Sequence, residues 1–463
     1  MAAHSKDANE LKKIVKAYDI RGLAGEQLTT AMMEALGCAA GEVAGAETWT
    51  LAHDMRDTGP TYARAFAKGL NRAGVDAVLA GLCATDMIYY IAGRHGTAGA
   101  MFTASHNPAE YNGIKLCLPG ARPIGLDTGL AEIRDRAVEL LEGADWPDKD
   151  GTVTEHDYLG EYAAYMRELV DLGGIRPLKV VVDAGNGMAG HTVPAVLGDG
   201  PLPALPLTID PLYFELDGTF PNHEANPLEP ANLVDLQERV RTTDADLGLA
   251  FDGDADRCFV VDADGEPVSP SAITALIAAR ELDKHPGASI VHNLITSRAV
   301  PEIVAENGGE AVRTRVGHSY IKATMAEVDA VFGGEHSAHY YFKEFWYADT
   351  GMLAAMHVLA AVGGGDQSLA DLAADLERYV ASGEINTSVD DTGEKLRDLR
   401  QIYGTTCDVD IDELDGLTLG YKDGTWANIR PSNTEPLLRL NVEGPDLAAM
   451  ERIRDEVLSH IRG

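Results

Sequence analysis

Short apolar runs bounded by turn residues alternate along the chain with stretches whose apolar residues recur every three or four positions. The first pattern is typical of buried strands and the second of amphipathic helices. Strands are expected at residues 75–82, 99–105, 178–185, 245–254 and 329–335. Helices are expected between them, for example at residues 61–74 and 271–285. This alternation predicts parallel α/β units.

The C-terminal part of the chain has a different pattern. Two strand-like runs, LTLGY and WANIR, flank the turn signal Lys422-Asp423-Gly424. A further strand-like run, LLRLNVE, then precedes an amphipathic stretch at residues 447–461. A hairpin followed by a strand and a helix predicts a small α+β domain.

The length of 463 residues exceeds what one hydrophobic core usually covers, and it favours about three or four domains. Changes of pattern place the boundaries near residues 155, 258 and 372, the last in the Gly-rich segment GGGDQS. The predicted domains are therefore residues 1–155, 156–258, 259–372 and 373–463.

The net charge limits the possible partners. Lys plus Arg number 38 against 73 Asp plus Glu, which gives a formal charge of −35 and opposes binding to nucleic acid or to an anionic membrane. An anionic substrate would need a local basic pocket, because salt screens the distant acidic surface. No segment indicates an obligate protein partner.

The five cysteines are odd in number, widely spread and free of any CxxC pair. This distribution disfavours a disulfide framework and a structural zinc site, and it favours a reducing cytoplasm. The sequence has no run of 18 apolar residues, and its first residues lack the apolar core of a signal peptide. We therefore expect a cytoplasmic protein that is not exported.

The hexapeptide DGDADR places Asp252, Asp254 and Asp256 on alternate residues and ends with Arg257. Three carboxylates this close are costly to bury unless a hard divalent cation lies among them. An EF-hand calcium loop would need glycine at its sixth position and glutamate at its twelfth, and both are missing. A solvated acidic turn does not explain the buried strand that runs into the motif. The hexapeptide therefore predicts a magnesium site.

The motif TASHNP follows a predicted strand and sets the hydroxyl of Ser105 beside the imidazole of His106. Asn107-Pro108 favours a turn there, which would expose Ser105 as a positioned nucleophile. Lys115, ten residues further on, could supply a cation to a phosphoryl group on that serine. An ordinary polar turn is the alternative.

Two further motifs carry candidate binding groups. In GEHSAH, Glu335 and Ser337 lie two residues apart and can point the same way, which suits adjacent sugar hydroxyls, whereas His336 points the other way and can equally be a packing residue. In RPSNTEP, four side chains fit a phosphate-binding loop, although a plain hairpin connection remains open. These four are Arg430, Ser432, Asn433 and Thr434.

The segment GNGMAG at residues 185–190 matches the dinucleotide-binding pattern GxGxxG, with Asp210 about 20 residues downstream. A nicotinamide dehydrogenase would not explain the other motifs. The segment from GNGMAG to the aspartate motif is also too short for a six-stranded nicotinamide domain. A tight strand-to-helix turn is the favoured interpretation.

The order and separation of TASHNP, DGDADR, GEHSAH and RPSNTEP, with KAYDIRG near the N-terminus, closely resemble the α-D-phosphohexomutase family. Within it, the resemblance is to the bacterial phosphomannomutase/phosphoglucomutase group. It spans nearly the whole chain. Ala255 and Ala338 stand where the family more often has glycine.

The resemblance implies three related mixed α/β domains and a C-terminal α+β domain around a central cleft. It implies that Ser105 carries a phosphoryl group in the active enzyme. Mg²⁺ is then held by that group and by Asp252, Asp254 and Asp256, and Arg257 balances charge on the phosphoryl group in transit.

The implied reaction interconverts hexose 6-phosphate and hexose 1-phosphate through a bisphosphorylated sugar, with hexose 1,6-bisphosphate as activator. His106 and Lys115 match positions taken to assist proton transfer. Arg21 in YDIRG and His318 in RVGHSYIK match residues that line the cleft.

The remaining motifs match groups that bind the substrate. Glu335 and Ser337 match the pair that binds O3 and O4 of the sugar, which are equatorial in both glucose and mannose, so we expect activity on both. The loop from Arg430 to Thr434 matches the site for the phosphate that is not reacting. Phosphoglucosamine mutase is the alternative within the family. Such enzymes tend to have serine at the position of Thr103 and glutamine at that of His336, so both residues disfavour it.

Overall fold

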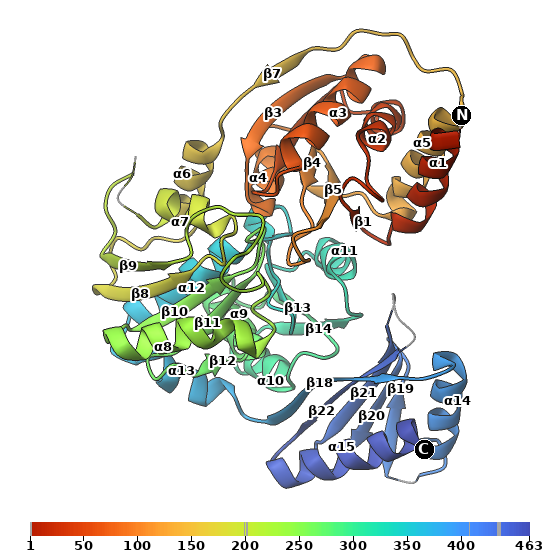
Figure 1. The fold of residues 1–463 in the computed structure, drawn as a ribbon. Coiled ribbons are helices and arrows are strands. Elements are labelled where there is room, and N and C mark those ends of the chain that lie inside the picture. The colour runs from red at the N-terminus through yellow and green to blue at the C-terminus, as the bar shows by residue number, and fades with distance from the viewer. Residues whose placement is uncertain (1, 199, 201, 407, 433–436) are drawn as a thin grey trace. The chain divides into compact units, whose positions relative to one another are not determined.

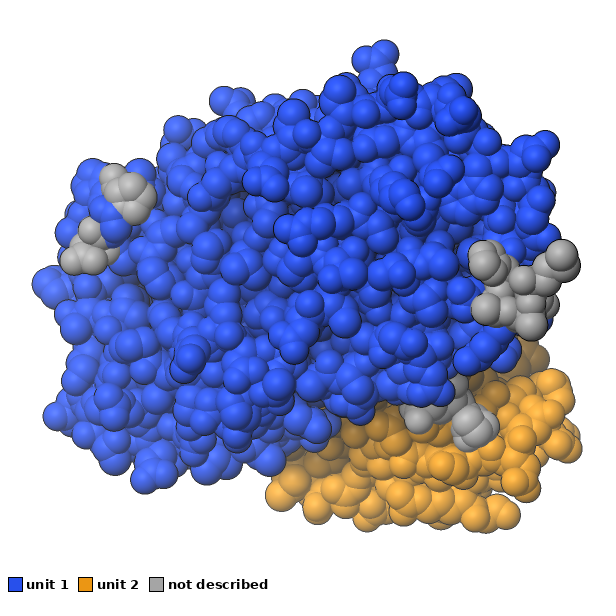
Figure 2. Space-filling view, turned by 45° about the horizontal axis from the view of Figure 1, so that its top comes forward, with its two compact units in different colours: residues 1–268, 338–370 blue, residues 269–337, 371–463 orange. Residues whose placement is uncertain are grey.

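The computed structural model of the chain describes residues 2–198, 200, 202–406, 408–432 and 437–463. The polypeptide forms two compact units, which Figure 2 colours separately. Unit 1 consists of Met1–Val268 and Ala338–Ala370, and unit 2 of Ser269–Ser337 and Asp371–Gly463. Within the described part of the chain, no helix combines the length and the apolar character that crossing a membrane requires.

The N-terminal sheet of unit 1 has the strand order β1-β5-β4-β2-β3-β7, with β6 paired to β5 (Figure 1). Its strands are β1 (Ile20–Leu23), β2 (Thr48–His53), β3 (Asp76–Leu82), β4 (Ala98–Phe102), β5 (Tyr111–Leu118), β6 (Arg122–Pro123) and β7 (Val153–Glu155). The strands β4, β2, β3 and β7 run parallel, whereas β5 is antiparallel to both β1 and β4. The carboxyl ends of the parallel strands therefore lie at one edge of the sheet.

Helices connect these strands and cover the sheet. They are α1 (Ala2–Ile14), α2 (Thr30–Val43), α3 (Gly59–Arg72), α4 (Thr85–Arg94) and α5 (Leu130–Glu142), with a short 3₁₀ turn η1 (Leu126–Thr128). In α3 the side chains of Tyr62, Ala63, Phe66, Ala67 and Leu70 are buried at three- and four-residue spacing. This spacing is why the segment forms a helix that packs into the core.

The second sheet of unit 1 has the order β12-β11-β10-β8-β9. Its strands are β8 (Leu178–Asp183), β9 (Leu207–Leu212), β10 (Leu247–Phe251), β11 (Cys258–Val261) and β12 (Pro267–Val268). Around it lie α6 (Leu159–Leu169), α7 (Ala189–Val196), η2 (Pro230–Leu233) and α8 (Val234–Thr243). The strands β9, β8 and β10 are parallel, and β10 turns back into the antiparallel β11. The loop at this turn carries the DGDADR motif.

A later stretch of sequence also belongs to unit 1. It consists of β16 (Tyr340–Phe342), η3 (Lys343–Phe345), β17 (Ala348–Asp349) and α12 (Gly351–Gly363). Nearly every residue of α12 is buried, and its N-cap is Thr350, whose hydroxyl accepts a hydrogen bond from the Leu353 N–H. The helix α13 (Leu369–Leu376) then spans the residues where unit 1 ends and unit 2 resumes.

Unit 2 contains a parallel α/β part and an antiparallel part. The first comprises α9 (Pro270–Lys284), β13 (Ser289–Asn293), α10 (Ala299–Glu306), β14 (Glu310–Thr314), α11 (His318–Val328) and β15 (Phe332–Gly334). The strand β13 pairs in parallel with both β14 and β15. The strand β13 is therefore parallel to both of its neighbours, as strands in α/β units are.

The antiparallel part of unit 2 has the strand order β18-β22-β21-β20-β19 (Figure 1). It comprises β18 (Val380–Ser388), α14 (Thr392–Tyr403), β19 (Val409–Asp412), β20 (Leu417–Tyr421), β21 (Trp426–Pro431), β22 (Leu437–Gly444) and α15 (Leu447–Arg462). Residues of α14 and α15, such as Leu399 and Ile453, share one apolar core with Leu419, Ile429 and Leu440 of the strands. This is the α+β arrangement that the C-terminal pattern predicts.

Candidate active site

The strand β4 ends in the loop that carries Ser105. The backbone N–H of Ser105 donates to the hydroxyl of Thr103 at 2.9 Å, and the serine is only 4% exposed. Its φ angle of 50° lies in the left-handed region, which costs a non-glycine residue about 1–2 kcal/mol. Such a conformation persists only where the surrounding structure holds it in place.

Arg56, which follows the neighbouring strand β2, holds the serine loop. Its guanidinium donates to four backbone carbonyls of that loop, those of Asn107 (2.6 Å), Pro108 (2.7 Å), Tyr111 (2.8 Å) and Ser105 (3.0 Å). Its Nε donates to the buried carboxylate of Asp54 at 3.3 Å. Burial raises the pKa of Asp54, although Arg56 acts in the opposite direction. One buried arginine thus fixes the backbone from Ser105 to Tyr111.

The loop between β10 and β11 carries the three aspartates. Asp252, Asp254 and Asp256 are at most 1% exposed, and one carboxylate oxygen of each lies within 4.8 Å of those of the other two. Ser105 Oγ donates to Asp252 Oδ2 at 2.9 Å. The fold therefore brings the serine and aspartate motifs into direct contact, although they stand 147 positions apart in the sequence.

Two cations lie against these carboxylates. Lys115 Nζ is 2.8 Å from Asp254 Oδ2 and 2.6 Å from Asp256 Oδ2, and Arg257 Nη2 is 2.8 Å from Asp252 Oδ2. Burial raises the pKa of Asp252 to about 7 against the opposing effect of Arg257. Burial alone would lower the pKa of Lys115, but Asp254 and Asp256 raise it above its usual value. Lys115 is therefore protonated in this arrangement.

His106 contributes a neutral imidazole. Its Nδ1 lies 2.7 Å from Arg257 Nη2 and 3.2 Å from Ser105 Oγ. Because a guanidinium can only donate, Nδ1 accepts this hydrogen bond. Burial, followed by the charge of Arg257, lowers the pKa of His106 well below its usual value. An uncharged ring nitrogen therefore lies beside the serine hydroxyl.

The aspartate cluster fits a hard divalent cation. Asp254 Oδ1 and Asp256 Oδ1 are buried and have no hydrogen-bond partner among the described residues. Leaving a buried carboxylate oxygen without a partner is costly, and oxygen ligands are those that Mg²⁺ prefers. Asp256 also forms a second close group with His339 and Asp349.

Three of the neighbouring residues support the two loops from other elements. Arg21 on β1 donates through Nη1 to the side chain of Asn107 at 2.5 Å. Thr85, at the start of α4, donates through Oγ1 to Asp254 Oδ2 at 2.6 Å and through its backbone N–H to Asp254 O at 2.9 Å. The backbone N–H of Met188 donates to Gly253 O at 2.9 Å.

The GNGMAG turn supports the aspartate loop. A Cβ on Gly187 would lie 2.6 Å from Gly253 O, and one on Gly190 would lie 2.2 Å from Phe214 O. Both glycines are thus required by close backbone approach within unit 1. The turn is the strand-to-helix connection that the sequence favours over a dinucleotide site.

Several site residues were not identified from the sequence. They are Asp54, Arg56, Thr85 and His339. The segment HDMRD sets an acidic side chain, Asp54, and a basic one, Arg56, directly after the buried strand β2. This pairing was the one local feature of the sequence that indicated a role for Arg56. Thr85 has no such signal, because its contact with Asp254 depends on the packing of α4 against the loop.

The residues expected to bind the sugar and its distal phosphate belong to unit 2. Glu335, at the end of β15, is buried and accepts from Asn293 Nδ2 at 3.1 Å. Ser337 is partly exposed, and His318 is the first residue of α11. His336 lies 3.4 Å from Ser271 Oγ, and burial lowers its pKa.

The predicted phosphate loop follows β21. Arg430 Nη2 is 2.9 Å from Glu384 Oε2, and burial lowers the pKa of Arg430 against the effect of that carboxylate. The backbone N–H of Ser432 donates to Leu437 O at 2.9 Å. Asn433 and Thr434 lie outside the described residues.

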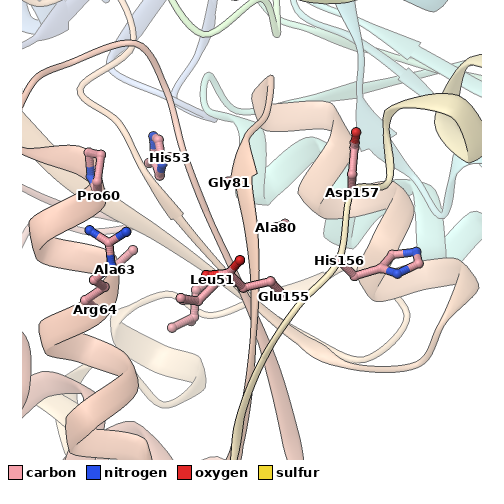
Figure 3. A pocket seen from close by; sticks show the side chains of 11 residues that line it. Leu51, His53, Pro60, Ala63, Arg64, Ala80, Gly81, Glu155, His156 and Asp157 are labelled. Carbon is pink, nitrogen blue, oxygen red and sulfur yellow. The ribbon is translucent and has the colours of Figure 1, made fainter.

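A separate pocket of about 360 Å³ opens in unit 1 beside α3 and β7. Figure 3 shows Pro60 and Arg64 on the helix and Glu155, His156 and Asp157 on the segment that includes the end of β7. Its lining combines both signs of charge on partly or fully exposed side chains. It contains neither Ser105 nor any of the three aspartates.

Comparison with protein families gives matches along most of the chain. The models described as "Phosphoglucomutase/phosphomannomutase, alpha/beta/alpha domain" I, II and III match residues 12–141, 160–265 and 269–379. The model of the C-terminal domain of the same family matches residues 384–460. The predicted fold class, three mixed α/β domains and a C-terminal α+β domain, is confirmed.

Individual relatives match over almost their whole length. A phosphomannomutase of Escherichia coli is 39% identical over 451 residues, which is 96% of this chain and 98% of that protein. A protein named phosphohexose mutases from Xanthomonas campestris is 38% identical over 97% of this chain and 99% of its own length. A solved structure of a phosphoglucomutase/phosphomannomutase family protein from Burkholderia thailandensis superimposes with a TM-score of 0.87 at 33% identity, covering 97% of each chain.

Proposed function

The chain belongs to the phosphoglucomutase/phosphomannomutase family, and from that premise we propose that this phosphohexomutase works through a phosphoserine at Ser105 and a bisphosphorylated sugar. The observation that supports this most directly is the 2.9 Å hydrogen bond from Ser105 Oγ to Asp252. Phosphoryl transfer depends on positioning the group and on stabilising its charge. A buried hydroxyl between a carboxylate cluster and two cations meets both needs.

In the first half of the reaction, the phosphoryl group on Ser105 Oγ passes to the free hydroxyl of a hexose monophosphate. The bond from phosphorus to Oγ breaks, a bond from phosphorus to the sugar oxygen forms, the sugar hydroxyl loses its proton, and Ser105 Oγ takes up a proton. We assign the proton transfers to His106 and Lys115. A protonated lysine can supply a proton, and a neutral imidazole can accept one at Nδ1 when the Arg257 hydrogen bond to that atom is released.

In the second half, the bisphosphorylated sugar turns and returns its other phosphate to Ser105 Oγ. The Ser105 hydroxyl loses its proton as its bond to phosphorus forms, and the sugar oxygen that is released takes up a proton, so that the enzyme regains its starting state. The exchange between hexose 6-phosphate and hexose 1-phosphate is then complete. Hexose 1,6-bisphosphate activates an enzyme that has lost its phosphoryl group, because it can donate one to Ser105.

Charge on the phosphoryl group is offset by Arg257 and Lys115. We assign Ser105, Asp252, Asp254 and Asp256 as Mg²⁺ ligands, which agrees with the two buried carboxylate oxygens that lack partners among the described residues. Bound there, Mg²⁺ would withdraw negative charge from the transferring group. Arg257 also keeps the His106 ring in place through Nδ1.

We assign recognition of the sugar to Glu335 and Ser337, and recognition of the phosphate that does not react to the loop after β21. The residues assigned to it are Arg430, near the end of β21, and Ser432, Asn433 and Thr434, which follow that strand in the sequence. Arg21 and His318 are assigned to the lining of the substrate site. Since O3 and O4 are equatorial in both glucose and mannose, the enzyme should act on phosphates of both sugars.

A coupled assay of mannose 1-phosphate, glucose 1-phosphate and glucosamine 1-phosphate, with catalytic hexose 1,6-bisphosphate, tests this function. We expect turnover of the first two and a loss of about 1,000-fold or more in Ser105→Ala. Ser459→Ala, on the exposed face of α15, is the control and should be unaffected. Activity on one hexose alone would contradict the dual specificity, and preference for glucosamine 1-phosphate would favour phosphoglucosamine mutase.

A further inference from the structure

Asp86 is a fully buried carboxylate that the proposed reaction does not use. It lies in the first turn of α4 and is 0% exposed. Its Oδ2 accepts hydrogen bonds from Thr350 Oγ1 at 2.6 Å and from Tyr162 Oη at 2.7 Å. Its Oδ1 has no hydrogen-bond partner among the residues described. A buried carboxylate held only by hydroxyl groups is costly, so a specific role is expected of it.

The residue before Asp86 contacts the metal-binding loop, which we define as residues 252–257. Thr85 donates to Asp254 Oδ2 at 2.6 Å and, through its backbone N–H, to Asp254 O at 2.9 Å. The N-terminal turn of α4 therefore fixes both the side chain and the backbone of one proposed metal ligand.

The residue after Thr350 contacts the other end of the same loop. A Cβ on Gly351 would lie 2.7 Å from the carbonyl carbon and oxygen of Arg257 and 3.0 Å from Ala255 O. The first turn of α12 thus packs directly on the backbone that follows Asp254. Thr350 is also the N-cap of α12, so its position determines where that turn begins.

We propose that Asp86 is a positioning residue for the metal-binding loop. It joins the N-terminal turns of α4 and α12, and these turns contact that loop at its centre and at its end. This inference rests on the proposed function, in which Asp252, Asp254 and Asp256 hold the metal. Asp86 does not ligate the metal. It acts through Thr85 on Asp254 and through Thr350 on the segment that ends at Arg257.

The surroundings of Asp86 indicate that its hydrogen bonds, and not its charge, do this work. Burial raises the pKa of Asp86 to about 7 against the hydrogen bonds from Thr350 and Tyr162, and the nearby carboxylates of Asp256 and Asp349 act in the same direction as burial. An asparagine keeps an oxygen that accepts from both hydroxyls and removes the charge. Asp86→Asn should therefore preserve the metal site, whereas Asp86→Ala should disturb it.

The two hydroxyl partners of Asp86 offer a matched pair of variants. Thr350→Val and Tyr162→Phe each remove one hydrogen bond to the same oxygen, and Thr350→Val also removes the side-chain acceptor that caps α12. Only Thr350 leads to the loop, since Tyr162 belongs to α6. A general loss of packing would make the two variants alike, whereas positioning of the loop would separate them. Thr350→Ser keeps the hydroxyl and should behave like the wild type.

The test is a calorimetric titration of Mn²⁺ into the full unphosphorylated chain without sugar. Outer partners of metal ligands typically contribute 10- to 100-fold in affinity, so we expect the Kd to rise about 10-fold or more in Asp86→Ala and Thr350→Val. Asp86→Asn, Thr350→Ser and Tyr162→Phe should stay within about 3-fold of the wild type. Asp254→Asn is included to locate the metal.

Equal weakening by Thr350→Val and Tyr162→Phe, or wild-type affinity in Asp86→Ala and Thr350→Val, would overturn the positioning role. Should Asp86→Ala fail to fold, Asp86→Leu takes its place, because it fills a similar space without an acceptor and leaves the Thr350 cap of α12 intact. Undiminished binding by Asp254→Asn would instead show that the proposed metal site itself is wrong. The two failures are thereby distinguished.

Discussion

The loops of unit 1 that are proposed to be catalytic and the loops of unit 2 that are proposed to recognise the substrate are built in different ways. Ser105, the three aspartates and Arg257 are at most 4% exposed, and both Ser105 and Arg257 donate hydrogen bonds to Asp252. Ser337 and Ser432 are partly exposed, and the side chain of Arg430 is 12% exposed. The serine, the aspartates and Arg257 are thus shielded from water, whereas the described residues of unit 2 proposed to bind the substrate, apart from the buried Glu335, are partly accessible.

The difference corresponds to what each set of loops is proposed to do. Groups that stabilise a phosphoryl group in transit act most strongly when they are fixed in advance and shielded from water. Groups that receive a sugar in two opposed orientations must remain accessible to it. Changes in unit 1 should therefore affect mainly kcat, and changes in unit 2 mainly KM.

The largest expected effect comes from Arg56, because it holds the serine loop. Arg56→Ala leaves the buried Asp54 without its cation, which should lower the free energy of unfolding by about 3–5 kcal/mol. Arg56→Lys keeps a charge but cannot reach four carbonyls and a carboxylate. Misplacing Ser105 should then lower kcat about 100-fold and change KM less.

Steady-state kinetics and chemical denaturation of both variants check this prediction. Arg64→Ala on α3 is the control, since Arg64 is exposed. Wild-type kcat in Arg56→Lys would mean that the serine loop keeps its geometry without the arginine, and the contrast between the two units would lose its main support.

Glu335→Gln should have a smaller effect than the Arg56 variants, and this effect should fall mainly on KM. A hydrogen bond to a charged group contributes about 1.5–3 kcal/mol, so KM should rise about 10- to 100-fold with less change in kcat. A deoxy sugar phosphate that lacks O3 or O4 should lose little further affinity in this variant. Glu327→Gln, exposed on α11, is the control. A fall in kcat with unchanged KM would contradict a recognition role.

The smallest effect concerns stability. Burial lowers the pKa of His292 to about 4, below the value of about 6.5 in an unfolded chain. The unfolded state binds more protons between these values, so stability should be complete above pH 6.5 and fall as the pH drops toward 4. His292→Gln should make the denaturation midpoint less dependent on pH in this window. An unchanged pH dependence would show that the ring is not held neutral by burial.

Local patterns in the sequence predicted much of the fold. The alternation of strands and helices and the C-terminal antiparallel sheet follow from periodicity and turn residues, which act over a few positions. The serine and aspartate loops were also predicted as separate motifs. Their contact could not be derived from spacing, because it depends on how β4 and β10 are arranged within unit 1.

The supporting residues left little or no trace in the sequence. Arg56 acts on backbone carbonyls, which any sequence can supply, and Asp86 acts through hydroxyls on α6 and before α12. The glycines of GNGMAG show the converse. Their pattern is that of a phosphate-binding turn, yet their close approach to Gly253 and Phe214 explains them.

Mass spectrometry of the peptide that contains Ser105, after incubation of the protein with hexose 1,6-bisphosphate, tests the central claim most directly. We predict the added mass of one phosphoryl group on Ser105, and its loss when hexose monophosphate is then supplied in excess. A peptide that stays unmodified while the enzyme turns over, or a phosphoryl group found on another residue, would contradict the phosphoserine mechanism.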